Sequence, residues 1–305
     1  MSSTPAQQSS FKDRTVIVTG AAGSIGAPLC IAFARAGANV IANDLGYSAS
    51  GAGSSDAPVT RIVDEIVSEG LSAVADTHDV ATEADKIVAG AMAKFGRIDI
   101  LVNNAGIIHY GSLEDSGPDI VRRIFEVNAL GAYALCHHAW THMKEQRYGR
   151  IINFTSDSVF GMPQSSAYVM SRGAILGVTR TIALEGAEYG ILANTVGPSA
   201  YSRMVADVSK NLPPAQLEWF KETYTGDSNV PVIMALASER NEMSGEIWTS
   251  GGYCMGRSIL GSCKDVKNVR NVDQCLEAMA ELKQPGREWT EPYSIQEFLA
   301  FKATS

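Results

Sequence analysis

The sequence contains no long apolar run, and no segment approaches the roughly eighteen uninterrupted apolar residues that a membrane-spanning helix needs. Its first ten residues, MSSTPAQQSS, hold neither a basic cluster nor an apolar stretch, so they do not resemble a secretory signal. Basic residues are in the minority, because 25 Lys and Arg stand against 33 Asp and Glu, and no block of like charge is present. We therefore expect no membrane span and no nucleic-acid partner.

Cysteine is scarce and shows no pattern. The five cysteines have no paired spacing and no CxxC motif, which is typical of free thiols in a reducing compartment. His138 and His142 have a spacing that can bind metal, but no third ligand accompanies them, so we expect no metal site. The chain ends in ATS and not in the peroxisomal signal SKL, so we expect a cytoplasmic protein.

Short β-rich runs alternate with longer helical stretches through most of the chain. The strand candidates are 15–19, 39–43, 72–76, 98–103, 150–155, 191–196 and 246–250. The candidates for crossover helices are 58–69, 81–95, 118–146 and 166–189. Most strand candidates are continuous apolar runs, as expected of strands buried on both faces. The pattern predicts an α/β fold: a single doubly wound parallel sheet of the Rossmann type, with helices on both faces.

Other segments fall outside this alternation. We expect residues 1–11 to be disordered, 12–255 to form one catalytic domain and 256–305 to form a C-terminal extension with two short amphipathic stretches. The Gly/Ser-rich residues 46–57 predict a loop after the second strand. Residues 199–230 predict an insertion over the carboxyl ends of the strands, where ligands of doubly wound sheets bind, and hence a substrate lid.

The first chemical motif is the glycine-rich turn TGAAGSIG at 19–26, which follows the first strand and opens a helix. Glycine lets the backbone turn tightly and approach a pyrophosphate, while a helix N-terminus offers free N–H groups. The alternative is a purely structural turn.

Asp44 follows the second strand, and a carboxylate there can accept hydrogen bonds from ribose hydroxyls and repel a 2′-phosphate. Because no Lys or Arg lies nearby, the sequence favours NAD over NADP, unless Asp44 is only a solvated turn residue.

The second motif is Tyr168-Val169-Met170-Ser171-Arg172. A spacing of four places Tyr168 and Arg172 on one helix face, where the cation can stabilise a tyrosinate that works as an acid–base group. Ser156 ends the fifth strand and could hydrogen-bond a substrate carbonyl or alcohol. Asn128 lies in an apolar helical stripe. It is either a core amide whose hydrogen bonds are all satisfied, or a functional group that supports a water relay or holds neighbouring backbone in place.

Together these motifs resemble the short-chain dehydrogenase/reductase family. The likeness rests on TGAAGSIG, Asp44, Asp79-Val80, Asn103-Asn104-Ala105-Gly106, Asn128, Ser156, Tyr168 and Gly197-Pro198. Within the family, IANDLG, FGRIDILVNNAGI and AWTHMKEQRYGRII are most similar to the branch of (3R)-hydroxyacyl-CoA dehydrogenases found in peroxisomal multifunctional enzymes. This closer likeness spans roughly residues 12–262.

The resemblance implies a cofactor site that runs from pyrophosphate and adenosine to nicotinamide. Its residues would be Gly20, Ser24, Ile25, Gly26, Asp44, Asp79, Val80, Asn104, Ala105, Gly106, Tyr168, Arg172, Gly197 and Pro198. It also implies a catalytic set in which a serine positions the substrate oxygen, a tyrosine exchanges its proton and an asparagine supports the relay. The members of that set are Ser156, Tyr168, Asn128 and Arg172.

Three departures from the family pattern stand out. Ser24 replaces a glycine, and the interval from Ser156 to Tyr168 is one residue shorter than usual, which keeps Ser158 as an alternative serine. Arg172 stands where the family has a lysine. Arginine keeps the positive charge but is bulkier, planar and effectively never deprotonated.

We therefore expect an NAD(H)-dependent oxidoreductase that moves a hydride to or from a secondary alcohol or ketone. The substrate would be lipophilic, for example a hydroxyacyl, polyketide, terpenoid or steroid-like compound of specialised metabolism. One alternative is a redox-neutral isomerase or cyclase on the same fold, and another is a non-catalytic dinucleotide-binding protein. The helices 118–146 and 166–189 carry small and apolar residues around much of their circumference, which predicts a homodimer or homotetramer.

Overall fold

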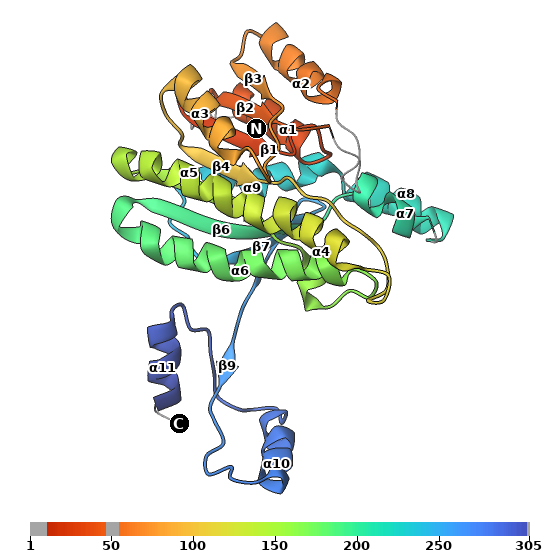
Figure 1. Ribbon diagram of the computed structural model, residues 1–305, viewed down its shortest axis with the longest axis vertical. Coiled ribbons are helices and arrows are strands. Elements are labelled where there is room, and N and C mark those ends of the chain that lie inside the picture. Colours follow the sequence, from red (N-terminus) through yellow and green to blue (C-terminus); the bar gives the residue numbers. More distant parts are fainter. Residues whose placement is uncertain (1–10, 47–54, 211, 304–305) are drawn as a thin grey trace, which may run out of the picture. The chain divides into compact units, whose positions relative to one another are not determined.

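A parallel sheet organises the N-terminal part of the protein (Figure 1). The structure, a computed structural model, describes residues 11–46, 55–210 and 212–303. The chain divides into two compact units, the first ending at Arg257 and the second beginning at Ser258. The N-terminal segment 1–10 and residues 47–54 of the predicted loop lie outside the described residues.

The first unit holds an eight-stranded sheet in the order β3-β2-β1-β4-β5-β6-β7-β8. Its strands are β1 (Thr15–Thr19), β2 (Asn39–Asn43), β3 (Ala73–Asp76), β4 (Ile100–Asn103), β5 (Gly149–Phe154), β6 (Ile191–Pro198), β7 (Ile247–Gly251) and β8 (Cys254–Ser258). The first seven pair in parallel, which confirms the predicted doubly wound fold. Only β8, which follows β7 after two residues, was not predicted, because its residues CMGRS lack an apolar run.

Helices cover both faces of the sheet (Figure 1). One apolar core joins the sheet to α1 (Gly26–Arg35), α2 (Ala57–Ser68) and α9 (Val230–Ala237). The other joins it to α3 (Ala84–Phe95), α4 (Pro118–Phe125), α5 (Gly131–Gln146) and α6 (Ser166–Gly186). Along β1, Val16 and Val18 enter the first core and Ile17 the second, because successive strand side chains point to opposite faces. Burial on both faces explains why the strands read as continuous apolar runs.

The strand order reverses between β1 and β4. The chain moves from β1 outward to β2 and β3, then returns to the other side of β1 to form β4. Crossovers on opposite sides leave a crevice at the carboxyl ends of these two strands, where doubly wound proteins bind ligands. Most motifs of the sequence analysis follow one of the strands β1 to β6, so the topology gathers them at this edge.

The helix predicted over 118–146 is not one α-helix. A π-helical turn, η2 (Glu126–Leu130), separates α4 from α5. A single π-helical turn contains one residue more than an α-helical turn and does not interrupt the pattern of apolar residues. The hydrophobic periodicity of 118–146 therefore did not reveal the π-helical turn. Short 3₁₀ turns η3 (Asp157–Phe160) and η4 (Ala187–Tyr189) follow β5 and α6.

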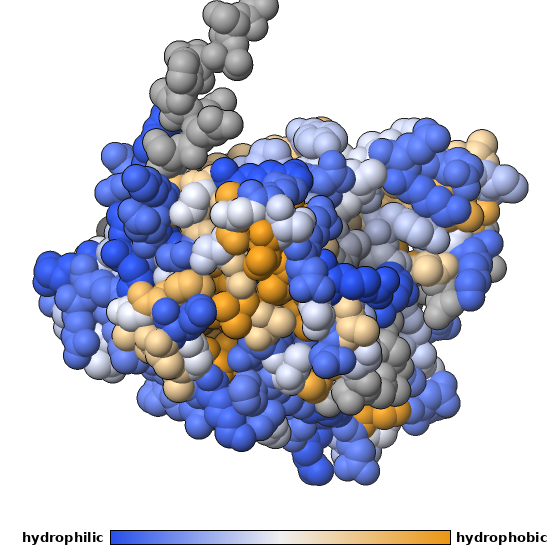
Figure 2. All heavy atoms as spheres, turned by 90° about the horizontal axis from the view of Figure 1, so that it is seen from above, coloured by the Kyte–Doolittle hydropathy of each residue, from blue (hydrophilic) through white to orange (hydrophobic). Residues whose placement is uncertain are grey.

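The segment after β6 is mostly helical, and the second unit contains two helices and a short antiparallel strand pair. The former contains α7 (Arg203–Ser209), α8 (Pro214–Thr223) and the 3₁₀ turn η5 (Gly226–Asn229). The second unit has an antiparallel pair, β9 (Ser262–Cys263) with β10 (Trp289–Thr290), and the helices α10 (Val272–Leu282) and α11 (Ile295–Ala303). No helix in the described ranges is long and apolar enough to cross a membrane. Polar side chains dominate the face in Figure 2, where apolar ones gather in a central strip.

Candidate active site

The glycine-rich turn is held tightly between β1 and α1. Gly20 has a φ of +65°, and a Cβ at Gly26 would lie 2.1 Å from the Gly20 carbonyl oxygen. The amide of Asn104, at the end of β4, donates to the carbonyls of Thr19 (2.7 Å) and Gly20 (2.9 Å). Glycine at these two positions therefore lets α1 begin against the turn, and Asn104 fixes the turn to β4.

Asp44 is oriented by backbone donors on both sides. Its Oδ2 accepts from the Ala22 N–H at 2.8 Å and its Oδ1 from the Gly46 N–H at 2.7 Å. Each carboxylate oxygen has two lone pairs, so both can accept one further hydrogen bond from a ribose hydroxyl. The side chain lines the main cavity next to the glycine-rich turn.

Asp79 and Val80 form the neighbouring wall of the cavity. The Asp79 carboxylate accepts from the Ala81 N–H (2.9 Å) and from the Arg123 guanidinium (3.2 Å). Its charge is therefore already neutralised by a cation from α4, and its position is fixed. Val80 is buried beside it and presents an apolar surface to the cavity.

Arg172 lies buried between β5, the loop after β4 and Tyr168. It is 3% exposed, and its Nη1 donates to the Phe154 carbonyl at 2.9 Å. Its guanidinium carbon lies 5.3 Å from the centre of the Tyr168 ring, so the structure brings together the pair that the sequence placed on one helix face. A Cβ at Gly106 would lie 1.9 Å from Arg172 Nη2, so only glycine leaves room for this guanidinium. The buried Arg172 Nε has no hydrogen-bond partner within the described part of the chain.

Ser156 caps η3 and faces the cavity. Its Oγ accepts from the Ser158 N–H at 3.2 Å, and its side chain lines the cavity together with Tyr168. Ser158, the alternative serine, does not line the cavity, and its hydroxyl is buried without a partner in the described chain. The geometry thus places Ser156, and not Ser158, beside Tyr168 on the cavity wall. Pro198 lines the same cavity, and Gly197 lies behind it against Asp157.

Asn128 brackets backbone and does not line the cavity. It lies in the π-helical turn, is 1% exposed and exchanges two hydrogen bonds with Ile107, accepting at 2.8 Å and donating at 2.9 Å. It also donates to Ser171 Oγ at 3.0 Å, and that hydroxyl donates to the Tyr168 carbonyl. These contacts match a satisfied core amide and equally a backbone bracket, and they tie the loop after β4 to the helix that carries Tyr168 and Arg172.

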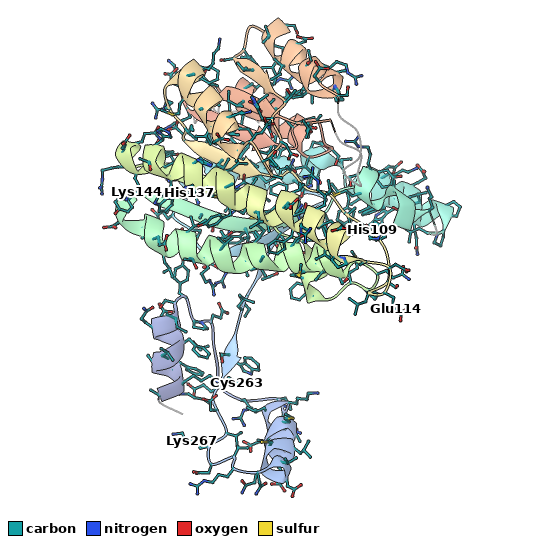
Figure 3. All side chains as sticks on the ribbon, viewed as in Figure 1. His109, Glu114, His137, Lys144, Cys263 and Lys267 are labelled. Atoms are coloured by element: carbon teal, nitrogen blue, oxygen red, sulfur yellow. The ribbon has the colours of Figure 1, made fainter. Side chains whose placement is uncertain are left out.

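One cavity of about 670 Å³ in the first unit is lined by most of these residues, but not by Gly26, Asn128, Ser158 or Gly197. Further walls of the cavity come from the loops after β3 and β4, from η3 and the loop that follows it, and from the segment 199–230 that the sequence predicted as a lid. The sequence analysis did not name their residues individually: His78, Tyr110, Asp157, Met162, Arg203, Trp219, Phe220 and Tyr224. Tyr110 reaches from the β4 loop to donate to the Met204 carbonyl of α7 at 3.1 Å. Figure 3 labels its neighbour His109 on that loop. The sequence contained one hint of these further walls. Tyr110 lies only four residues beyond Gly106, in the loop that follows the fourth predicted strand.

The segment after β6 also contacts the glycine-rich turn. A Cβ at Gly226 in η5 would lie 1.7 Å from the Ser24 carbonyl oxygen, which places η5 directly on the turn. The residues present fit a dinucleotide. A glycine cradle, a helix N-terminus and an acceptor carboxylate lie at one end of the cavity, and an orphaned guanidinium nitrogen lies at the other.

Neither histidines nor cysteines add a metal or thiol centre in the described residues. No group of three or more His, Cys, Asp or Glu side chains there is arranged to hold a metal ion. His138 is exposed on α5, and burial raises the pKa of Cys136 to about 12, so its thiol stays protonated near neutral pH.

The fold and the cavity define a dinucleotide-binding α/β protein. Residues 14–212 match the short chain dehydrogenase family. The chain belongs to that family, which confirms the resemblance. It is 40% identical over 245 residues to peroxisomal multifunctional enzyme A of Dictyostelium discoideum, an alignment that covers 79% of this chain and 53% of that protein. The chain thus spans about half of that relative's length.

Solved structures agree with this assignment. A short chain dehydrogenase from Mycobacterium avium superposes with a TM-score of 0.76 at 27% identity, over 90% of this chain and 98% of that one. An NAD(P) dependent gluconate 5-dehydrogenase from Beutenbergia cavernae, so described and carrying NADP at low occupancy, gives 0.69 at 29% identity. That alignment covers 80% of this chain and 97% of that one.

The contact between Gly106 and Arg172 can be tested with a double-mutant cycle. Gly106→Ala should lower single-turnover hydride transfer about 10²-fold, because the added Cβ displaces the guanidinium by an ångström or more. Arg172→Lys removes the Nη2 that the Cβ meets, so Gly106→Ala should cost less than about tenfold in that background. Circular dichroism and thermal melting verify folding. An equal loss in both backgrounds would show that the contact does not matter.

Proposed function

We propose that this chain is an NAD(H)-dependent oxidoreductase acting on a secondary alcohol or ketone of a lipophilic substrate, such as a hydroxyacyl, polyketide, terpenoid or steroid-like compound. One observation carries the proposal: a single cavity connects the glycine-rich turn and Asp44 to Ser156, Tyr168 and Arg172. Aromatic and apolar lid residues close its other side, which suits an apolar carbon skeleton. The family assignment supports the reaction class.

The proposed chemistry divides between cofactor and protein. A bound nicotinamide supplies or accepts the hydride. Ser156 donates a hydrogen bond to the substrate oxygen and orients the reacting carbon. In the oxidation direction the Tyr168 oxygen takes the alcohol proton as the hydride leaves carbon, and in reduction Tyr168 returns that proton to the carbonyl. Arg172 holds a buried positive charge beside the Tyr168 ring, and burial strengthens its attraction for negative charge that develops during the reaction.

Cofactor choice follows from Asp44, and NADP remains the less favoured candidate. The cavity lining includes two side chains of the Lys/Arg type, Arg172 and Arg203, and neither belongs to the segment after β2. A 2′-phosphate beside Asp44 would therefore meet an anion without a compensating cation.

The native protein should bind NADH more tightly than NADPH in fluorescence titrations. Asp44→Ala should shrink this preference at least tenfold, because it removes both the ribose acceptor and the repulsive charge. Asp119→Ala, which changes a carboxylate with a 97% exposed side chain on α4, should leave the preference unchanged. Equal native affinity for the two cofactors would refute the assignment to NAD.

A redox-neutral isomerase or cyclase is the second candidate, and the observation that favours it is Arg172 itself. A planar guanidinium with an unpartnered Nε can bind a substrate carbonyl or anionic group through two parallel hydrogen bonds. A non-catalytic dinucleotide-binding protein is the third alternative, and the shared cavity of Ser156 and Tyr168 weighs against it.

Replacing Arg172 separates these functions. For a dehydrogenase, Arg172→Lys should keep or raise hydride transfer because the charge beside Tyr168 survives, whereas Arg172→Met should lower it 10²-fold or more. The measurement is single-turnover NADH oxidation with a panel of lipophilic ketones, with NADH affinity measured separately. Turnover without cofactor consumption, combined with a strong Arg172→Lys defect, would favour the redox-neutral reaction. Absence of turnover by every variant, with NADH still bound, would favour the non-catalytic alternative.

We further propose a symmetric homodimer or homotetramer assembled through α5 and α6. Some small residues on which the sequence prediction rested are used inside the subunit, because Ala129 and Ala132 are buried. The exposed surface of α6 nevertheless carries Met170, Gly177 and Leu184, and no atom lies within 4 Å of a Cβ built at Gly177. Figure 3 labels His137 on α5, whose ring stacks on the exposed Tyr133.

A cytoplasmic location for the protein remains a prediction from the sequence.

Gly177→Arg should convert the assembly to smaller species in light scattering at micromolar concentration. The subunit itself tolerates the change, because Gly177 faces open space within the chain and arginine is a better helix former. Gly90→Arg on α3 is the matched control, since Gly90 is also exposed and helical, and it should leave the mass unchanged. A native mass of 32.5 kDa would contradict the proposed assembly.

A further inference from the structure

Three aromatic side chains line the cavity from the segment after β6. Trp219 and Phe220 belong to α8, and Tyr224 directly follows that helix. The Tyr224 carbonyl accepts from the Tyr201 N–H at 2.6 Å, just beyond the end of β6. At the end of β7, the Tyr224 ring lies 3.1 Å from the position that a Cβ at Gly251 would occupy. This aromatic cluster of Trp219, Phe220 and Tyr224 is therefore anchored at the carboxyl ends of β6 and β7.

The order of the strands separates the aromatic cluster from the adenosine end of the cavity. In the order β3-β2-β1-β4-β5-β6-β7-β8, Asp44 follows β2 and Ser156 follows β5. The cluster lies on the side of β6 and β7, so Ser156 comes between it and Asp44 along the edge of the sheet. A dinucleotide with its ribose at Asp44 and its nicotinamide beside Tyr168 leaves this side of the cavity to the substrate.

The ring of Trp219 keeps an uncovered face. Trp219 is 58% exposed, and among the described rings it meets only Tyr224, at a centroid distance of 5.7 Å and an interplanar angle of 78°. Phe220 and Tyr224 are tilted by 48°, so the cluster contains no parallel stack. An edge-to-face contact covers at most one face of one ring. Water satisfies an exposed polar group, but an apolar ring stays unfavourable in water, so a ligand that covers this face is stabilised.

Other residues of the cavity lining are apolar and include two thioethers. Met162 lines the cavity from the loop after η3, and Met204 and Val205 line it from α7. Methionine sulfur makes favourable contacts with the edges of aromatic rings. A planar ring in this space would therefore meet both ring faces and sulfur atoms. A flexible acyl chain would also bury apolar surface, but it would gain no ring–ring contact and would lose rotational freedom on binding.

We propose that the aromatic cluster selects substrates with a planar aromatic or conjugated ring, which stacks on the open face of Trp219. Ser156 and Tyr168 then act on a ketone or secondary alcohol of a fused ring. The substrate class is aromatic polycyclic ketones and the corresponding alcohols, and not linear acyl compounds. This inference rests on the proposed oxidoreductase function and narrows its substrate class. Trp219 is the specificity-determining residue, because it is the most exposed of the three rings.

Three ketones with equal numbers of carbon atoms test the proposal. 2-Tetralone contains an aromatic ring, trans-2-decalone is its saturated counterpart and 2-decanone is a linear chain. With NADH, kcat/KM should be highest for 2-tetralone. Trp219→Leu should lower the ratio of 2-tetralone to trans-2-decalone about 2- to 12-fold, because the stacking contact is lost, whereas Trp219→Phe should keep most of the ratio. The intrinsic reactivities of the ketones cancel when the ratio is compared between variants.

Trp289→Leu is the matched control for the same change of side chain. Trp289 is 61% exposed, belongs to the second unit and does not line the cavity, so the ratio should stay unchanged. An equal loss for all three ketones in Trp219→Leu would mean that Trp219 only supports the segment after β6. A native preference for 2-decanone would mean that the cavity takes a linear chain. Either result would overturn the proposal.

A binding measurement keeps the test independent of turnover. With NADH bound, 2-naphthol and trans-decahydro-2-naphthol cannot react, because both already carry the hydroxyl and the cofactor is reduced. Calorimetry should give tighter binding of 2-naphthol, although the saturated skeleton is at least as apolar, and Trp219→Leu should remove the difference. If no ketone is turned over but this difference is seen, the proposed oxidoreductase function fails and the assignment of the aromatic cluster stands. Equal or weaker binding of 2-naphthol by the native protein would refute that assignment.

Discussion

The close approach of backbone at the carboxyl ends of β1 and β4 is the constraint on which the site depends. Gly26 must lie against the Gly20 carbonyl for α1 to begin, and Asn104 ties that turn to the end of β4. This arrangement leaves the N-terminus of α1 open toward the cavity. The same edge then receives Asp44 from β2 and Ser156 from β5, because parallel strands end together.

The fold could be predicted from sequence because its strands are buried on both faces, and runs such as TVIVT and ILVN stay apolar throughout. The predicted site residues could be placed on the correct strand ends for the same reason. The π-helical turn around Asn128 was missed, because an added residue in one turn leaves the apolar pattern intact. Asp157 was not predicted as part of the cavity wall, because a charged residue after a strand is common.

Arg172 shows how one substitution depends on its surroundings. An arginine in place of a compact lysine needs space for a planar group, and Gly106 provides that space. The Phe154 carbonyl then anchors the guanidinium beside Tyr168, so the charge is kept near the tyrosine although the side chain differs. Asn128 fixes both walls of this arrangement, since it holds the β4 loop at Ile107 and α6 at Ser171. The charge is therefore positioned by backbone groups.

The contact between Gly226 and Ser24 links the two ends of the cavity. Ser24 belongs to the turn that would hold a pyrophosphate, and Gly226 to η5 in the segment after β6, other residues of which line the far side of the cavity. No Cβ fits between them, so only glycine at position 226 allows η5 to pack against the turn. Tyr110 adds a second connection, from the β4 loop to α7. The turn at the cofactor end of the cavity and the segment after β6 are therefore packed directly against each other.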